Sequence, residues 1–320
     1  AVILILATTK QNFFAHRLLT ENLVLLFFAV LMLALTLALQ RDQHRWWSLV
    51  GIALALLALT RPEYLYLFYA FAVLAVVVTL WFLRRSDLFH QCTRIATLIF
   101  SAIIVLSPWM ARNYHHFGSM ALTGGYGDQT IAYRTAYNEM NEQEWKAAFI
   151  YWLPGYGEQL AAKYLPPESY QKLGTDANSY LYKEGLEIFE QGLAAVDGDR
   201  TLLSGYLLRT EILEKPIAHL LSSVPLAWRG VLTGKYLAVL GLPCFVFLLF
   251  FAIKMKHFVI VALSFPALLM IALYAGVSVS IPRYNIYLIY YYGIATAWFL
   301  VSAARGIVDK FFVENTPGAR

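Results

Sequence analysis

The sequence predicts an all-α fold: a polytopic transmembrane helical bundle with a helical extramembrane insertion. Hydrophobic residues make up 59% of the chain and charged residues only 14%, whereas soluble globular chains are about half apolar and about a quarter charged. Charge-free runs of twenty, eighteen and twenty-one residues cover Tyr64–Leu83, Tyr236–Ile253 and Tyr284–Ala304. A helix that crosses the hydrocarbon core needs roughly 20 apolar residues, so these runs have the length of membrane spans.

Hydropathy divides the chain into four parts. Residues 1–111 hold a partial first helix and about four spans, and residues 112–216 form a polar helical segment. Residues 217–304 hold one interfacial helix and three spans, and residues 305–320 form a tail. The predicted spans are Asn22–Gln40, Trp46–Thr60, Tyr64–Leu83, Ile95–Ala111, Tyr236–Ile253, Phe258–Ser280 and Tyr284–Ala304. Ile217–Leu232 contains Pro225 and Arg229, which favours an interfacial or re-entrant helix over a full span.

The chain begins inside an apolar run, Ala1–Ala7, that is too short to cross a membrane. Neither an initiator Met nor the basic region of a signal peptide precedes this run. We therefore expect the sequence to be the later part of a longer protein.

Basic residues predict the orientation of the spans, because short basic loops lie on the cytoplasmic side. Residues 112–215 hold nine Lys/Arg and fourteen Asp/Glu, and the remainder holds sixteen Lys/Arg and six Asp/Glu. The basic residues on one side are Arg41, Arg45, Arg84, Arg85, Arg94, Lys254, Lys256, Arg305 and Lys310. All these residues fall on the same, cytoplasmic side if residues 217–232 do not cross the membrane. The acidic segment is then periplasmic or luminal, in a multi-pass protein of the bacterial inner membrane.

The acidic segment is too rich in tyrosine and tryptophan to be a disordered, solvated tail. Asn141 and Glu144 form a helix-capping pattern, and Pro166-Pro167-Glu168 marks another helix start. Residues 178–196 carry apolar side chains at helical spacing. A helical segment without strands is the prediction.

Polar residues collect at the ends of the spans that face the acidic segment. The candidate donor-binding residues are Glu21, Arg61, Arg112, Asn113, Arg283 and Tyr284. If they converge, their guanidinium groups suit a phosphate or pyrophosphate, which arginine grips with two hydrogen bonds. Alternatively, each arginine anchors its helix at the membrane interface, and Glu21 complements a helix dipole.

Other motifs predict no chemistry. His115-His116 has no third ligand at metal spacing, and Gly124-Gly125-Tyr126-Gly127 lacks the Lys and Ser/Thr of a phosphate-binding P-loop. Cys92 and Cys244 form neither a disulfide nor a metal pattern. The basic excess lies in short loops between apolar runs, which argues against nucleic acid as a partner.

Four motifs occur in order along the spans. They are Arg17-Leu-Leu-Thr-Glu21-Asn, Leu57-Ala-Leu-Thr-Arg61-Pro, Pro108-Trp-Met-Ala-Arg112-Asn and Pro282-Arg283-Tyr284. Over most of residues 10–300, this order resembles the C-type membrane glycosyltransferases. That group includes bacterial dolichyl-phosphate-mannose-mannosyltransferase-like proteins and the lipid A aminoarabinose transferases.

The resemblance implies transfer of a sugar from a polyprenyl-phosphate-linked donor to a glycan, lipid or protein acceptor on the outer face of the lipid bilayer. It implies that Glu21 matches an acidic residue at a span entrance, and that the arginines contact the donor phosphate. The family's catalytic aspartate lies in the first outer loop, so we expect the catalytic base upstream of residue 1 and this chain alone to be inactive. These motifs require no cofactor, and they leave open whether the reaction uses a divalent metal ion.

Two other classes of function remain as alternatives. A transporter or flippase for lipid-linked glycans would carry charges in the middle of its spans, whereas the charges here lie at the span ends. A non-catalytic membrane assembly subunit would use the outer segment to hold a partner.

Overall fold

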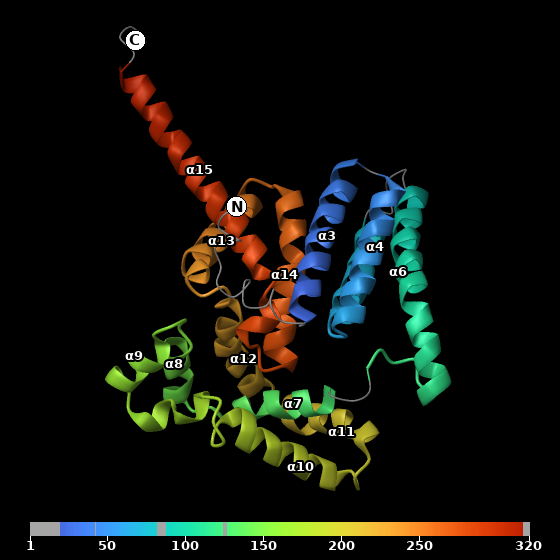
Figure 1. Cartoon of the computed structure of the whole chain (residues 1–320), viewed down its shortest axis with the longest axis vertical. Helices are drawn as coiled ribbons and strands as arrows, with labels where there is room; N and C mark the ends of the chain where they lie inside the picture. Colours follow the sequence, from blue (N-terminus) through green and yellow to red (C-terminus); the bar gives the residue numbers. More distant parts are fainter. Residues whose placement is uncertain (1–19, 42, 82–87, 124–126, 316–320) are drawn as a thin grey trace.

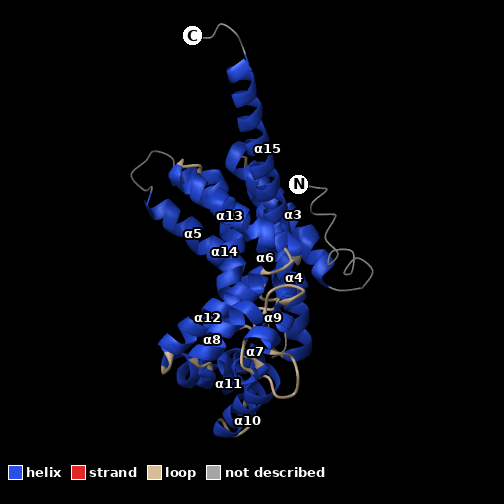
Figure 2. Ribbon diagram, turned by 90° about the vertical axis from the view of Figure 1, so that its left-hand side faces the viewer, coloured by secondary structure: helices blue, strands red, loops and turns tan. Residues whose placement is uncertain are grey.

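The computed structural model describes residues 20–41, 43–81, 88–123 and 127–315. Within these ranges the backbone forms helices and turns and no strand, which confirms the all-α fold (Figures 1 and 2). Four of these helices are long and apolar enough to cross a membrane, and two shorter apolar helices accompany them. The predicted helix tail at Ala1–Ala7 lies outside the described residues.

The first half of the bundle consists of four helices that stand side by side (Figure 1). They are α3 (Thr20–Arg41), α4 (His44–Thr60), α5 (Tyr64–Trp81) and α6 (Leu88–Phe117). α4 and α6 approach closely at Gly51, where a Cβ would overlap the Leu98 carbonyl. The Ser101 hydroxyl of α6 donates a hydrogen bond to the Ser48 carbonyl of α4 at 3.0 Å. Small residues at such crossings allow membrane helices to pack backbone against backbone.

α6 is longer at both ends than the predicted span Ile95–Ala111, and Pro108 lies inside the helix without ending it. A proline inside a helix leaves one backbone carbonyl without its usual N–H partner, here that of Ile104. The Ser107 hydroxyl donates to this carbonyl at 3.2 Å and replaces part of the missing interaction. The helix therefore continues to Phe117.

The second half of the bundle follows the polar segment between α6 and α12, which we call the outer segment. It consists of α12 (Pro216–Val231), α13 (Tyr236–Lys254), α14 (Phe258–Val277), a 3₁₀ turn η6 (Pro282–Asn285) and α15 (Leu288–Asn315). α14 ends before the predicted Ser280, because Ser280 has φ +43° and Pro282 disfavours a helical conformation at Ile281. α15 starts at Leu288 and not at Tyr284, because Pro282–Asn285 form the 3₁₀ turn η6.

Aromatic residues join the two halves of the bundle. The Phe28 ring of α3 stacks on Tyr287, with centroids 4.7 Å apart, and meets Tyr64 of α5 edge-on at 6.5 Å. Three consecutive tyrosines at the start of α15 then reach three different helices. Their hydroxyls donate to the backbone carbonyls of Leu25 in α3 (Tyr290), Leu263 in α14 (Tyr291) and Val231 in α12 (Tyr292). α15 is thereby fixed in rotation and depth.

The outer segment forms a helical layer against one end of the bundle (Figure 1). Its helices are α7 (Gly127–Thr135), α8 (Glu142–Tyr151), α9 (Gly157–Tyr164), α10 (Gly185–Ala195) and α11 (Arg200–Leu207), with short 3₁₀ and π turns between them. The capping pattern at α8 is confirmed, since Asn141 and Glu144 exchange side-chain and backbone hydrogen bonds. Pro167 starts only a 3₁₀ turn, Pro167–Ser169.

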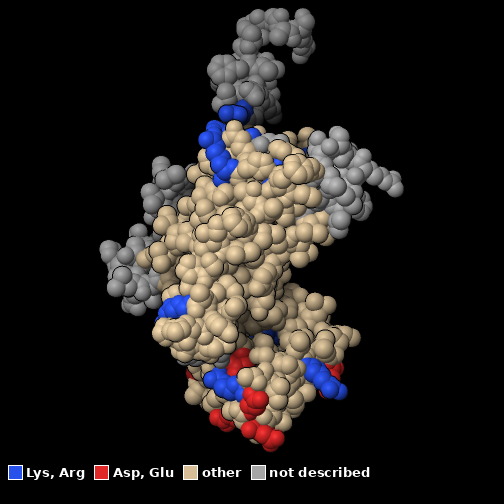
Figure 3. Space-filling view, turned by 90° about the vertical axis from the view of Figure 1, so that its right-hand side faces the viewer, with Lys and Arg blue, Asp and Glu red and all other residues tan. Residues whose placement is uncertain are grey.

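Charge separates the two ends of the molecule. Figure 3 shows a body with few charged side chains, a group of Lys and Arg at one end, and a layer at the other end that holds all the visible acidic side chains together with further Lys and Arg. The basic end carries Arg41, Arg45, Arg94, Lys254, Lys256 and Arg305, at the ends of α3, α4, α6, α13, α14 and in α15. Arg84 and Arg85 lie outside the described residues. The body between the two ends has the apolar surface expected of membrane-spanning helices.

Arg134 of α7 attaches the outer layer to the bundle. Its side chain is fully buried and has no carboxylate partner among the described residues. Its Nε donates to the Ala275 carbonyl at the end of α14 at 2.5 Å, and its Nη2 donates to the His219 carbonyl and the Ser223 hydroxyl of α12. Nη1 donates to Asn138, so all three guanidinium nitrogens are used.

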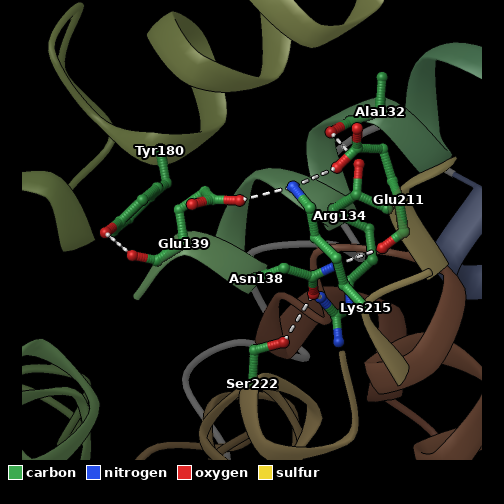
Figure 4. A network of polar contacts seen from close by, with 9 residues as sticks. Ala132, Arg134, Asn138, Glu139, Tyr180, Glu211, Lys215 and Ser222 are labelled. Atoms are coloured by element: carbon green, nitrogen blue, oxygen red, sulfur yellow. Dashed lines mark hydrogen bonds and ion pairs between the residues drawn. The ribbon is translucent and has the colours of Figure 1, made fainter. Parts of the chain in front are cut away.

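A polar network continues from Arg134 through η1 (Ala136–Glu139), as Figure 4 shows. The Asn138 amide donates to the Glu211 carbonyl and accepts from the Ser222 hydroxyl. Lys215, just before α12, forms ion pairs with Glu139 and Glu211. α12 is thus held between the outer layer and α14.

α12 has 16 residues and is not among the four helices that could cross a membrane. One stripe of it is apolar and exposed, at Ile217, Leu220, Leu221 and Val224. These positions follow the helical spacing of an amphipathic helix. The interfacial position of this helix in a membrane stays a prediction.

Replacing Arg134 with Met should loosen the outer layer. The carbonyls of Ala275 and His219 would lose a charged donor, and unsatisfied buried groups cost about 1–3 kcal/mol each. We expect the free energy of local opening of α7 to fall by about 2–4 kcal/mol, measured by amide hydrogen exchange. Lys215→Met, which removes exposed ion pairs, should change it by less than about 1 kcal/mol. Equal effects of the two variants would contradict the anchoring role.

The protein should also lose stability in mild acid. Burial, and next the charge of Arg134, lower the pKa of His219 to about 4, whereas an unfolded histidine has a pKa of about 6.5. Between these values the unfolded state binds more protons, so the free energy of unfolding should fall as the pH falls from 6.5 toward 4. His219→Gln should flatten this dependence in thermal unfolding at different pH values. An unchanged slope in the variant would exclude His219 as its source.

Candidate functional site

Four of the six predicted site residues meet at the end of the bundle that faces the outer layer. They are Glu21 at the start of α3, Arg61 after α4, and Arg283 and Tyr284 in η6. Contacts with one another or with shared neighbours join them, as described below. We call this set, together with Glu63 and Tyr274, the outer-end cluster.

Arg61 occupies a turn that its own sequence dictates. Pro62 disfavours a helical conformation at the residue before it, and Arg61 is extended, with φ −146° and ψ 113°. Its backbone N–H still caps α4 by donating to the Leu57 carbonyl at 2.8 Å. The side chain folds back, and its Nε and Nη2 contact Glu63 Oε1 at 2.8 and 2.6 Å.

Two tyrosine rings enclose the Arg61 guanidinium. Its carbon lies 4.7 Å from the ring centroid of Tyr284 and 6.0 Å from that of Tyr274. The Tyr274 hydroxyl donates to Glu63 Oε1 at 3.2 Å. Only 13% of the Arg61 side chain is exposed, so the ion pair is largely shielded from water and held by α4, α5, α14 and η6 together.

Burial acts to lower the pKa of Arg61, but the neighbouring Tyr274 and Glu63 more than offset this effect. The pKa of Arg61 therefore lies above its ordinary value. The guanidinium stays charged at every pH at which the protein is folded. A positive charge is thus permanent at this position.

Arg283 lies on the same tyrosine but is held differently. Its guanidinium carbon is 5.6 Å from the Tyr284 ring centroid, and 53% of its side chain is exposed. Its closest carboxylate is Glu21, with Nε 3.7 Å from Oε1, beyond hydrogen-bonding distance. Glu21 itself is buried, with 4% of its side chain exposed, in the first turn of α3, where the helix dipole stabilises a negative charge.

Arg112 and Asn113 do not belong to this cluster. The Asn113 amide donates to the Ala121 carbonyl at 2.7 Å and accepts from Arg112 at 2.8 Å. The Arg112 guanidinium packs 4.7 Å from the Trp109 ring centroid on its own helix. Because α6 continues past Pro108, both residues shape the end of that helix. This is the anchoring alternative that the sequence left open for each arginine.

Two cluster members were not among the predicted site residues. Glu63 stands in the Arg61-Pro62-Glu63 turn, and its place after a proline could have marked it as the partner of Arg61. Tyr274 lies inside an apolar run near its outer end. A tyrosine at that depth is typical of an interface anchor, so its sequence position gave no specific signal.

Within the described residues no group of three metal-ligating side chains occurs. The rings of His115 and His116 lie 5.0 Å apart and contact each other. The carboxylates of the cluster, Glu21 and Glu63, are each next to an arginine. A cation would have to compete with these arginines for the two carboxylates.

No protein-family model, curated protein or solved structure matches this chain.

Removing the Glu63 carboxylate should destabilise the bundle. Glu63→Ala leaves the shielded Arg61 charge without its partner, and we expect a loss of about 2 kcal/mol in the free energy of unfolding. The double variant Arg61→Met/Glu63→Ala should recover part of that loss, because no unpaired charge is left. Thermal unfolding in detergent measures both. As a control, Lys146→Ala breaks an exposed pair in α8 and should cost less than about 0.5 kcal/mol. A double variant as unstable as the sum of its parts would argue against the pair.

Proposed function

We propose that the protein is a membrane glycosyltransferase that takes a sugar from a polyprenyl-phosphate-linked donor, with the outer-end cluster as the site of the donor phosphate. One observation supports this most: Arg61 and Arg283 lie against the same tyrosine ring, at the end of the apolar bundle. A lipid phosphate occupies this depth of a membrane. Its polyprenyl chain would lie along the apolar surface of the spans.

The two arginines have different roles in this proposal. Arg61 is clamped by Glu63 and enclosed by Tyr274 and Tyr284, so it supplies a fixed positive charge. Arg283 is half exposed and only weakly engaged by Glu21, so it can turn toward an incoming anion. Bidentate contacts between arginine and phosphate are among the stronger hydrogen bonds in proteins.

The same positions suit the reaction. Transfer breaks the bond between the anomeric carbon of the sugar and a phosphate oxygen, so negative charge develops on the departing lipid phosphate. A cation fixed beforehand near that oxygen stabilises the transition state. Arg61 and Arg283 would serve this purpose, and the long contact of Arg283 with Glu21 would let it turn to the donor.

The orientation of the protein in the membrane is inferred from the charges at its two ends. The basic end would face the cytoplasm, and the outer layer would then face the periplasm of a bacterial inner membrane. The acceptor, a glycan, lipid or protein, would approach between the bundle and this layer. On the face shown in Figure 3 the molecule is hollowed between the apolar body and the acidic layer.

A transporter of lipid-linked glycans is the second candidate. Such a protein needs polar groups along a path through the membrane. In the four spans of the described chain, the charged side chains lie near the helix ends: Glu21 and Arg41, Arg94 and Arg112, and Lys254. This distribution favours chemistry at one face over passage through the bundle.

Arginine variants test the proposal in the full-length protein, in membranes that also contain a polyprenyl-phosphate-linked sugar with a labelled sugar group. Arg283→Ala should lower transfer to acceptor by about tenfold or more, because a charge-assisted contact contributes about 1.5–3 kcal/mol. Arg112→Ala removes a cation at the same end of the bundle but outside the cluster, and should leave transfer within about twofold. Equal transfer by Arg283→Ala and wild type would remove the cluster from the site. Movement of the intact donor between leaflets, without release of polyprenyl phosphate, would favour the transporter.

A further inference from the structure

A second candidate site lies at the opposite, basic end of the bundle. There a partly enclosed cavity of about 200 Å³ opens among α3, α4, α5, α6 and α14. Its walls are mainly apolar and include Leu35, Phe71 and Leu98. A dry apolar cavity of about 150 Å³ admits benzene, so this cavity has room for a segment of a hydrocarbon chain.

Polar groups line one part of this cavity. They are Arg94 and Gln91, in the first turns of α6, and Trp47 in α4. Arg94 Nη1 donates to Gln91 Oε1 at 3.3 Å. The indole N–H of Trp47 is buried and has no hydrogen-bond partner within the described part of the chain. Buried donors are rarely left unsatisfied, so an acceptor from a bound molecule fits this position.

The ligand that matches this lining has an apolar tail and an anionic, hydrogen-bond-accepting head. Basic pockets between membrane helices bind the head groups of anionic lipids. Arg94 lies at the end of the bundle where Arg41, Arg45 and Lys254 also lie, which raises the local concentration of anionic lipid. The cavity is separated from the outer-end cluster by the length of the spans, so the donor phosphate of the proposed reaction is not its ligand.

We propose that this cavity binds one anionic phospholipid of the leaflet at the basic end. An acyl chain lies among Leu35, Phe71 and Leu98, and the phosphate lies at Arg94, with the Trp47 indole N–H donating to a head-group or ester oxygen. The lipid fills the space between α3, α5 and α6 and joins these helices where direct packing is incomplete. This site is independent of the function proposed for the other end.

Native mass spectrometry of the detergent-solubilised chain tests the proposal, with phosphatidylglycerol and phosphatidylcholine of the same acyl chains as probes. Wild type should bind phosphatidylglycerol about tenfold more tightly than phosphatidylcholine. Arg94→Gln should abolish this preference, and Arg94→Lys should retain most of it. Ala262→Phe, which places a ring into the cavity from α14, should weaken binding of both lipids. Arg45→Gln is the matched control, since Arg45 is an exposed cation at the same end that packs on Trp46.

Two results would overturn the proposal. One is a preference for phosphatidylglycerol that Arg94→Gln leaves intact. The other is displacement of the lipid by inorganic phosphate together with unchanged binding in Ala262→Phe, which would reduce the site to a surface charge. If Ala262→Phe does not fold, the comparison of Arg94→Gln with Arg94→Lys still decides, because both retain a long polar side chain.

Discussion

The buried guanidinium of Arg134 fixes the geometry on which the rest of the outer end depends. A buried cation without a carboxylate is costly to desolvate, and burial lowers the pKa of Arg134 to about 9, so it is still charged at neutral pH. The carbonyl end of α14 compensates, since the last carbonyls of a helix lack N–H partners and carry the negative end of its dipole. Ala275 accepts from Arg134, and the adjacent Gly276 carbonyl accepts from His219.

The end of α14 that Arg134 caps also forms part of the outer-end cluster. Tyr274, the residue before Ala275, is the one that contacts both Arg61 and Glu63. η6, which holds Arg283 and Tyr284, follows α14 after a short extended connection. A shift of α7 relative to α14 would therefore move one wall of the outer-end cluster. The outer layer and the cluster are coupled through two consecutive residues of one helix.

The sequence predicted where the apolar helices lie, because the cost of placing a charge in the membrane confines Arg, Lys, Asp and Glu to helix ends. Four of the seven predicted spans correspond to helices of the described chain that are long and apolar enough to cross a membrane. The sequence predicted the ends of helices less well. Pro108 resembles a boundary, but the Ser107 hydroxyl covers the carbonyl that it frees. Ser280 resembles part of a span, but the positive φ there and Pro282 end α14 earlier. Both outcomes depend on local hydrogen bonds and dihedral angles that hydropathy does not record.

Membership of the cluster was harder to predict than the spans. Arg61 and Arg112 each follow an apolar run and look equivalent in sequence. Arg61 is followed by a proline, so its helix ends and its side chain turns back into the bundle. Arg112 lies in a helix that continues, so its side chain stays beside Trp109. The tilt and rotation of each helix decide which side chains converge, and contacts such as those of Phe28 with Tyr64 and Tyr287 hold α3, α5 and the start of α15 together.

The cluster is close to neutral, with two arginines and two carboxylates, and this balance bears on how it could bind an anion. Arg61 already has a short, shielded contact with Glu63, and breaking it would leave an unpaired charge in a dry site. Arg283 would lose little by leaving Glu21, because their contact is long and the arginine is half exposed. An incoming phosphate would therefore recruit Arg283 first, while Arg61 contributes through its field without changing partner. Such a site has one rigid cation, Arg61, and one that can move, Arg283. It is therefore stable without a ligand and can still bind one.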